Sequence, residues 1–420
     1  MTEELPATRH DPYAALREPG FGWYALGNVL SVLGVQMQTV AVGWEIFQRT
    51  GDPLSLGLVG LVQVGPVLAF AIPSGHVADR YDRRHVVFVT SLVMAASSLG
   101  LAYLSLTHGA VGWMYAFLLL AGIARAFLRP AKSSLVPLLV PREKFSNAAS
   151  WNAGGLQLAT IVGPAAGGLL IWLSGPASVY FADIVCSAAF AFLVSSIRIR
   201  PVAAPPKGTS ISDLTAGFRF VRNQPIMLAA MTLDMVGVLL GGATALLPIY
   251  ANEILHVGSF GQGLLRASEA VGALAMSVWL AHRPPFQNAG RALYLTVVGF
   301  AGATIVYGLS STMWLSMLAL FALGAFDMVS VVIRQTLVQV LTPDELRGRV
   351  SAVNTLFISV SNELGGFESG VAARYLGTVG SVVAGGIGTL VATAAVNVAW
   401  PQLRAVGRLD QVPIPTAPVA

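Results

Sequence analysis

The sequence predicts an all-helical integral membrane protein with twelve transmembrane helices in two halves of six. Three observations lead to this fold class: the composition, the long apolar segments and the distribution of positive charge. Only 11% of the 420 residues are charged, against roughly 25% in soluble domains, and the mean hydropathy is +0.69. This composition cannot supply the charged surface of a soluble protein. It therefore excludes a soluble multidomain enzyme, a disordered chain and a nucleic-acid-binding protein.

Twelve apolar segments are long enough to cross a bilayer, which takes about 20 mostly apolar residues in a helix. The segments are continuously apolar rather than alternating, so a membrane β-barrel is disfavoured. The predicted spans are residues 21–48, 54–78, 86–106, 112–135, 146–173, 177–197, 225–250, 259–281, 292–309, 313–336, 349–375 and 379–402.

The positive charges fall mainly on one side of this arrangement. With a cytoplasmic N-terminus, 18 of the 25 Lys and Arg residues lie in cytoplasmic segments and two, Arg49 and Arg374, in outer segments. The remaining five lie within helices or near their ends. This asymmetry follows the positive-inside rule and predicts that both termini are cytoplasmic.

The longest polar stretch divides the chain into two halves. It begins with a proline-rich linker and continues with Ile211, Leu214, Phe218 and Val221, whose spacing is typical of an amphipathic helix on the inner membrane surface. The predicted organisation is a cytoplasmic N-terminal tail (1–20), a first six-helix half (21–197), a cytoplasmic linker (198–224), a second six-helix half (225–402) and a cytoplasmic C-terminal tail (403–420).

An offset of 202 residues relates the two halves. One ungapped register carries eight identities from the fourth span of each half into the fifth, including the pairs Asn152–Asn354 and Gly163–Gly365. Chance similarity between apolar, Gly-rich stretches is the alternative, but asparagine pairs are not hydropathy matches. Parallel repeats of this kind are typical of transporters whose halves rock about a central site.

The loop after the second span carries a signature. Residues 75–84 read G-H-V-A-D-R-Y-D-R-R and resemble the G-x-x-x-D-R-x-G-R-R loop of the major facilitator superfamily, with Asp82 in place of the second glycine. The resemblance implies that Asp79 helps to lock the cytoplasmic ends of the halves in the outward-facing state, as a carboxylate docks on a helix N-terminus or an Arg. Alternatively, these charges only fix topology and hold the loop at anionic lipid. The gating-loop residues are Gly75, Asp79, Arg80, Arg83 and Arg84.

The fifth span carries a second motif. Gly163, Pro164, Gly167 and Gly168 resemble the G-P-x-x-G-G part of the antiporter motif of facilitator exporters, although Ala159 replaces the expected upstream glycine. Proline removes one helix hydrogen bond and glycine permits close packing, so a bend or a pliable contact is expected. An ordinary proline–glycine kink is the alternative.

Within the superfamily, residues 122–130, 241–251 and 362–370 resemble the enterobactin-exporter group. This resemblance implies the major facilitator fold, a bacterial cytoplasmic membrane location, and export of a siderophore, drug or metabolite by proton antiport through alternating access. A proton-coupled importer and a non-transporting sensor or scaffold are the alternatives. An enzyme is not expected, because the six His residues form no metal-binding pair and no phosphate loop occurs. The expected partners are a small-molecule substrate, protons and lipid; we expect a monomer without cofactor, metal or nucleic acid.

Ionisable residues within the spans are functional candidates, because charges in hydrocarbon are costly. Glu363 is the leading proton carrier, since no cation lies within a turn of it on its own helix and a desolvated carboxyl takes up a proton more readily than one in water. A structural salt bridge with an Arg of another span is the alternative. The further proton-coupling candidates are Asp234, Asp327 and Glu368.

The remaining polar residues of the spans are candidates for contacting substrate or for acting as counter-ions. Arg125 is expected either to hold an anionic substrate or to serve as a counter-ion. Arg266 and Glu269 share a helix face and are expected to neutralise each other. Glu45 and Asp183, near the outer ends, are expected to be hydrated. The candidates are Arg125, Arg266, Glu269, Arg334, Asn28, Gln36, Gln38, Gln63, Asn152 and Gln157, with Trp44, Phe321 and Phe326 as aromatic additions.

Overall fold

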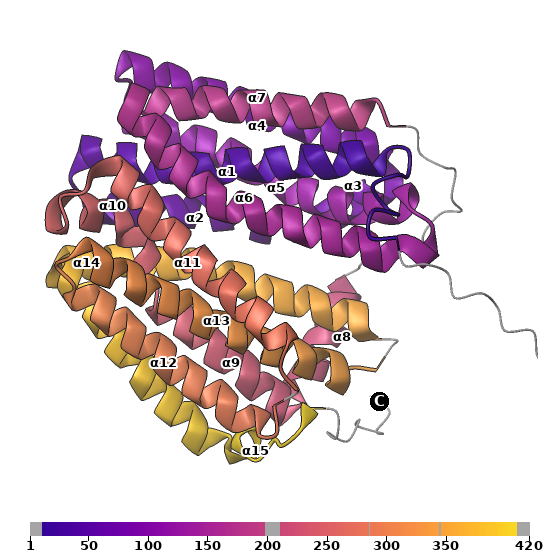
Figure 1. The fold of residues 1–420 in the computed structure, drawn as a ribbon, viewed down its shortest axis with the longest axis vertical. Helices are drawn as coiled ribbons and strands as arrows, with labels where there is room; N and C mark the ends of the chain where they lie inside the picture. Colours follow the sequence, from indigo (N-terminus) through magenta and orange to yellow (C-terminus); the bar gives the residue numbers. More distant parts are fainter. Residues whose placement is uncertain (1–10, 198–210, 285, 344–345, 410–420) are drawn as a thin grey trace, which may run out of the picture.

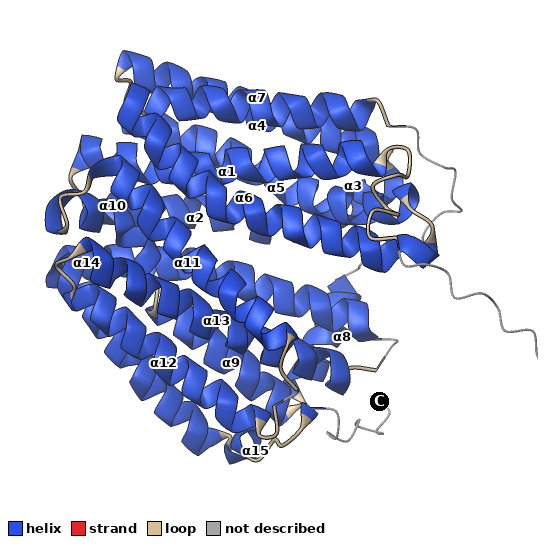
Figure 2. Ribbon diagram, viewed as in Figure 1, coloured by secondary structure: helices blue, strands red, loops and turns tan. Residues whose placement is uncertain are grey.

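The computed structural model describes residues 11–197, 211–284, 286–343 and 346–409, and within these ranges all regular structure is helical (Figures 1 and 2). The first half contains α1 (Phe21–Thr50), α2 (Pro53–Ala69), α3 (Ala71–Arg80), α4 (Arg83–Thr107), α5 (Val111–Leu139), the short turn η1 (Arg142–Lys144), α6 (Phe145–Ser174) and α7 (Pro176–Ser195). The second half contains α8 (Ile211–Arg222), α9 (Pro225–Leu240), η2 (Ala243–Leu246), α10 (Leu247–Ile249), η3 (Tyr250–Ile254), α11 (Gly258–Ala281), α12 (Ala289–Leu309), α13 (Met313–Leu341), α14 (Arg347–Ala399) and α15 (Pro401–Arg404).

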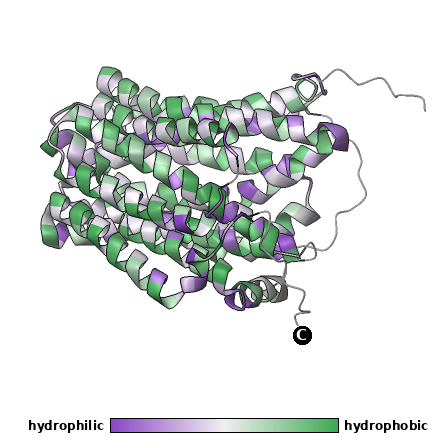
Figure 3. Cartoon of the chain, turned by 60° about the horizontal axis from the view of Figure 1, so that its bottom comes forward, coloured by the Kyte–Doolittle hydropathy of each residue, from purple (hydrophilic) through white to green (hydrophobic). Residues whose placement is uncertain are grey.

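The twelve predicted spans are present among the described residues. Ten helical segments are long and apolar enough to cross a membrane, and α2 is a shorter apolar helix of 17 residues. The segment α14 contains two predicted spans, because Gly377, with φ of 74°, kinks the chain between them. Hydrophobic residues predominate along the helices of both halves (Figure 3).

Two predicted spans are broken in the structure. The span predicted at 54–78 ends as α2 at Ala69, and α3 begins after Phe70. The span predicted at 225–250 stops at Leu240, and the chain continues as a 3₁₀ turn and a π turn to Ile254. Close packing accompanies this second break, because a Cβ on Gly242 would lie 2.5 Å from the carbonyl oxygen of Gly365 in α14.

The two halves are joined at one end of the bundle and separate toward the other (Figure 1). We call the end at which α2 and α11 begin the closed end. There a single apolar core includes Trp44 of the first half and Leu247 of the second. Toward the opposite, open end, where α3, α8 and α15 lie, each half has its own core, one around Leu135 and one around Leu337. The contact between halves runs mainly along α2–α14 and α6–α11.

Small residues bring the two halves together near the closed end. A Cβ on Gly168 of α6 would lie 2.5 Å from the carbonyl oxygen of Ser259 and 3.1 Å from Cα of Gly263 in α11. A Cβ on Gly370 of α14 would lie 2.8 Å from Cα of Gly57 in α2. Gly168 and Gly370 are 202 residues apart, as are Gly57 and Ser259. The repeat offset found in the sequence therefore also relates the two contacts between the halves.

The loop between α3 and α4 is anchored by the residue that departs from the family signature. The Asp82 carboxylate accepts a hydrogen bond from the backbone N–H of Arg84 (2.9 Å) and pairs with its guanidinium (2.8 Å). The same guanidinium donates to the carbonyl of Ile197 after α7 (2.8 Å). Asp82 has a φ of −58°, a conformation that does not require glycine. The side chain of Asp79 lies outside the described part of the structure.

The linker helix α8 packs against the second half. Phe220 and Val221 are buried, and the ring of Phe218 stacks on Phe357 of α14 with centroids 6.5 Å apart. A Cβ on Gly217 would lie 2.8 Å from the backbone carbonyl oxygen of Arg349 in α14. The proline-rich part of the predicted linker (198–210) and the outer parts of both predicted tails lie outside the described residues.

We predict that Asp82→Gly, which restores the family signature, destabilises the protein. Loss of the helix cap and of a screened ion pair should lower the free energy of unfolding by about 0.5–1 kcal/mol, since the carboxylate is half exposed. The hydrogen bond from Arg84 holds the pKa of Asp82 below its usual range. The stabilisation is therefore present above the unfolded pKa of about 3.9 and is lost as the pH falls through the folded value. Thermal unfolding at pH 7 and pH 3 measures both effects.

In this experiment Asp82→Asn keeps a hydrogen-bond acceptor for the N-terminus of α4 but removes the charge. Its melting temperature should therefore lie between those of wild type and Asp82→Gly. Equal melting temperatures of wild type and Asp82→Gly at pH 7 would contradict the assignment.

We also predict that Gly168→Val opens the closed end, because its side chain would overlap Ser259. A reporter cysteine at Thr244, introduced together with Cys186→Ala, should react several-fold faster with an impermeant maleimide added from the closed end. Gly154→Val is the matched control on the same helix, since a Cβ there meets nothing within 4 Å. Equal labelling of the two variants would show that this contact does not close the bundle.

Candidate functional site

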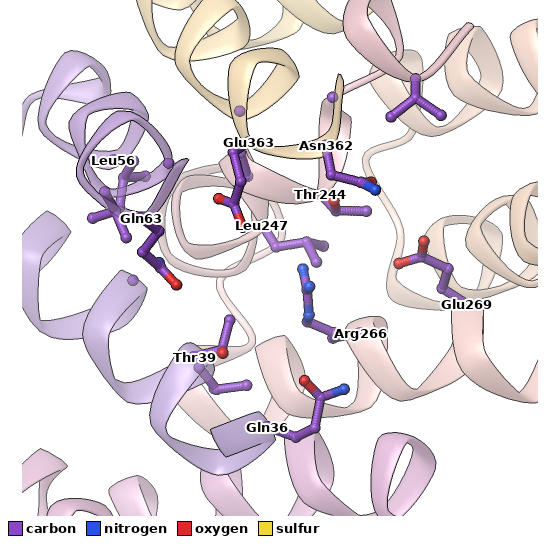
Figure 4. Close-up of a pocket in the computed structure, with 18 of the residues that line it drawn as sticks. Gln36, Thr39, Leu56, Gln63, Thr244, Leu247, Arg266, Glu269, Asn362 and Glu363 are labelled. Atoms are coloured by element: carbon purple, nitrogen blue, oxygen red, sulfur yellow. The ribbon is translucent and has the colours of Figure 1, made fainter. Parts of the chain in front are cut away.

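A cavity of about 420 Å³ lies between the halves, near the middle of the bundle (Figure 4). The first half contributes α1, α2 and α5 to its wall, and the second contributes α9, α11, α12, α13, α14 and the segment that follows the break after α9. This volume falls within the usual range for small-molecule sites.

Seven of the predicted residues line this cavity. Figure 4 shows the amides of Gln36 and Gln63 on the side of the first half, with Arg266, Glu269 and Glu363 on the side of the second. The guanidinium of Arg266 points into the space between them. The seven predicted residues are Gln36, Gln63, Arg125, Arg266, Glu269, Asp327 and Glu363.

The charges that line the cavity are distributed unevenly between the halves. Among the described residues, the first half supplies two Arg residues of α5, Arg125 and Arg129, and no carboxylate to the cavity wall. The second half supplies one cation, Arg266, and the carboxylates of Glu269, Asp327 and Glu363. Among the described residues, none of these six forms an ion pair with N···O of 4.0 Å or less. Arg266 and Glu269 therefore do not neutralise each other by direct contact.

Glu363 is held at the cavity wall by the packing of α14 on α2. A Cβ on Gly60 of α2 would lie 2.5 Å from the backbone carbonyl oxygen of Glu363, so the two helices touch at this position. Its charged neighbours are Arg125, Arg129 and Arg266. Within the described residues Glu363 has no ion-pair partner, so the expected alternative, a structural salt bridge, is not observed.

Asp234 and Arg334 do not line this cavity. They form an ion pair between α9 and α13 inside the second half, with both side chains buried. A second cavity of about 20 Å³ lies beside Asp234 and is bordered also by Asp327 and Ser330. This is room for about one water molecule. Asp327 thus borders both cavities. Asp234 borders only the smaller cavity, and Arg334, its partner in the ion pair, borders neither.

The other predicted polar residues lie outside the cavity wall, and all of them except Glu368 form hydrogen bonds between helices. The Asn28 amide donates to Asn152 (2.7 Å), and the Gln38 amide donates to Ser98 (2.8 Å). The Gln157 amide donates to the carbonyl of Ala270 (3.2 Å), which links α6 to α11. Glu368 accepts a hydrogen bond from Ser369 (3.5 Å). The aromatic residues Trp44, Phe321 and Phe326 are also absent from the cavity wall, which instead includes Phe300.

Glu45 and Asp183 are buried, so the prediction that they are hydrated is wrong. Glu45 is 4% exposed, pairs with Arg49 at 2.5 Å and accepts a hydrogen bond from Tyr180 (2.8 Å). Asp183 is 1% exposed and accepts a hydrogen bond from Ser98 (2.5 Å). The i, i+4 spacing of Glu45 and Arg49 is the sequence signal that indicates the first of these contacts.

Sequence reasoning also missed several residues that line the cavity. Arg129 lies four residues after Arg125 and so shares its helix face. This spacing is the sequence signal that could have predicted Arg129 in the cavity wall. Its guanidinium donates to Ser359 of α14 (3.4 Å). Gln262, four residues before Arg266, and Thr39, three residues after Gln36, carry a similar signal, whereas Thr244 and Asn362 were missed although they also line the cavity.

Comparison with known proteins agrees with this architecture. A sequence family described as transmembrane secretion effector matches residues 10–419. The enterobactin exporter EntS of Escherichia coli O1:K1 / APEC is 25% identical over 382 residues, which cover 89% of this chain and 90% of that protein. The EntS protein of Citrobacter koseri is 25% identical over 384 residues with the same coverage.

Solved structures share the fold. A bacterial homolog of the human lysosomal transporter Spinster, in an inward-facing and occupied conformation, has a TM-score of 0.73 at 14% identity and covers 94% of this chain and 99% of its own. The nucleoside transporter NupG has a TM-score of 0.67 at 14% identity, with 94% and 100% coverage. These relatives and fold neighbours are transporters rather than enzymes.

We predict that Asp234→Asn strongly destabilises the protein, because it leaves the buried guanidinium of Arg334 without its anion. The expected loss is about 3–5 kcal/mol in the free energy of unfolding, and the double variant Asp234→Leu/Arg334→Met should recover most of it. Thermal unfolding of the purified protein measures both. Arg374→Gln, which breaks an exposed pair with Asp52, is the control with little effect. A double variant as unstable as the single one would contradict this account.

Proposed function

Because the chain belongs to the transmembrane secretion effector family of the major facilitator superfamily, we propose that it exports a small organic molecule by proton antiport through alternating access. The chain is a multi-pass cell membrane transporter. Export, proton coupling and a siderophore, drug or metabolite as substrate are our proposal. The names of the relatives as enterobactin exporters support it.

The observation that carries the proposal is the cavity between the halves and the carboxylate within it. Glu363 lines this cavity, has no ion-pair partner among the described residues and lies on a helix at the contact between the halves. A carboxylate in such a place gains or loses a proton without breaking a buried salt bridge. A change in its charge also acts on both halves at once.

The way the halves touch supports alternating access. They pack through small residues at the closed end and have separate cores toward the open end. Rocking about the cavity would part the α2–α14 and α6–α11 contacts and bring the open end together. A proton on Glu363 favours one of these states and substrate favours the other, each through its differential affinity. We propose that one chain carries out this cycle as a monomer, with the open end facing the cytoplasm.

The test uses inverted membrane vesicles that contain the protein and are acidic inside. A panel of siderophores and lipophilic drugs is added, and loss of the proton gradient is followed with a pH-sensitive dye. We expect at least one compound to dissipate the gradient with wild type and not with Glu363→Gln, because the amide cannot carry the proton. Glu253→Gln, an exposed carboxylate of the second half, is the matched control and should behave as wild type.

The outcomes separate the parts of the proposal. Substrate-dependent proton loss that persists in Glu363→Gln would keep the antiport mechanism and reject the residue. The absence of any response, together with proton-driven uptake into right-side-out vesicles, would instead establish an importer.

A further inference from the structure

The cavity has two poles of opposite charge, one on each half. The positive pole consists of Arg125 and Arg129, one turn apart on α5 of the first half. The negative pole consists of Glu269, Asp327 and Glu363 of the second half, partly offset by Arg266. When all six groups are ionised, the first half contributes two positive charges to the wall and the second half contributes a net two negative charges.

The poles face the same space but are not paired with each other. No ion pair of 4.0 Å or less connects them among the described residues. The Nε atom of Arg125 is buried and has no hydrogen-bond partner in the described part of the chain. A buried guanidinium nitrogen without a partner is costly, and a ligand that supplies the missing partner recovers that cost.

From this arrangement we infer that the substrate is a zwitterion that bridges the halves, with an anionic group on Arg125 and Arg129 and a cationic group on the carboxylates of the second half. This inference rests on the proposed function and names the substrate class of the same cavity. A purely anionic or purely cationic molecule satisfies one pole and leaves the other unpaired. The cavity volume of about 420 Å³ accommodates a molecule of drug size.

The same arrangement explains how substrate and proton exclude each other. The cationic group of the substrate and a proton both neutralise the negative pole, and they compete there. A molecule carrying only negative charge would bind at the Arg pole and would stabilise a protonated carboxylate nearby, so it would be transported with the proton instead of in exchange for it. Exchange therefore requires a cationic group on the substrate.

The test compares molecules that differ only in charge. We would use norfloxacin and 4-(aminomethyl)benzoic acid, each as the zwitterion, as the ethyl ester, which keeps only the cation, and as the N-acetyl derivative, which keeps only the anion. Binding to the purified full chain in lipid nanodiscs is measured by titration calorimetry at pH 7. At least one zwitterion should bind at least tenfold more tightly than both of its derivatives.

Two variants test which charged group of the substrate each pole binds. Arg125→Gln should reduce the preference for the zwitterion over its ethyl ester at least threefold, because only Arg129 remains in the positive pole, and should keep the preference over the N-acetyl derivative. Glu363→Gln should reduce the preference over the N-acetyl derivative at least threefold and leave the preference over the ester. Arg374→Gln and Glu253→Gln, which change charges outside the cavity, should leave both ratios as in wild type.

The inference is overturned if the single-charge derivatives bind as tightly as the zwitterions, or if neither zwitterion binds. Its failure is distinguishable from failure of the proposed function. Proton exchange driven in vesicles by uncharged compounds would keep the antiport and reject the zwitterion. Tenfold selective binding of zwitterions that never dissipate a proton gradient would keep the substrate class and reject the antiport.

Discussion

The membrane does not solvate charge, and this constraint organises the whole molecule. Ionised side chains in the spans face lipid only at a cost of several kcal/mol, so they lie between helices or in the space between the halves. The chain uses both solutions. Asp234 and Arg334 pair inside the second half, whereas Arg125, Arg129 and Glu363 line the cavity without ion-pair partners among the described residues. The first arrangement stabilises one half, and the second leaves charges available to a ligand.

The contacts between the halves meet a different requirement, because in the proposed cycle they must both hold the halves together and separate. Gly168 against Gly263, and Gly370 against Gly57, bring backbones together with few interlocking side chains. Such contacts gain van der Waals energy without the deep interdigitation that makes separation slow. The 202-residue offset relates the two contacts, because it separates Gly168 from Gly370 and Gly57 from Ser259, the residue of α11 that Gly168 also meets. Pro164 and Gly168 of the α6 motif thus lie at a contact between the halves, whereas Gly163 and Gly167 pack against α1 of the same half.

Hydropathy patterning was sufficient to predict the helical membrane fold, because it reports directly on the lipid environment. The twelve spans follow from these patterns, but the breaks at Phe70 and Gly241 do not, since apolar residues continue through both. The same limit applies to the site. Glu363 and Arg125 were found because a charge in a span is conspicuous, whereas Gln38 and Asn28 resemble cavity residues in sequence and lie in helix contacts instead. Sequence periodicity defines a helix face, but it does not tell which partner that face meets.

In the proposed mechanism, the placement of the poles on different halves couples recognition of the substrate to movement of the halves. A ligand bound to Arg125 on α5 and to Glu363 on α14 connects two bodies that otherwise touch through small residues, so its binding energy depends on their relative position. A proton on Glu363 removes one end of that connection. Substrate and proton then favour different arrangements of the same two bodies, which is the differential affinity that exchange requires. On this reasoning the coupling needs no separate relay between a proton site and a substrate site, because both ligands act on the same pole.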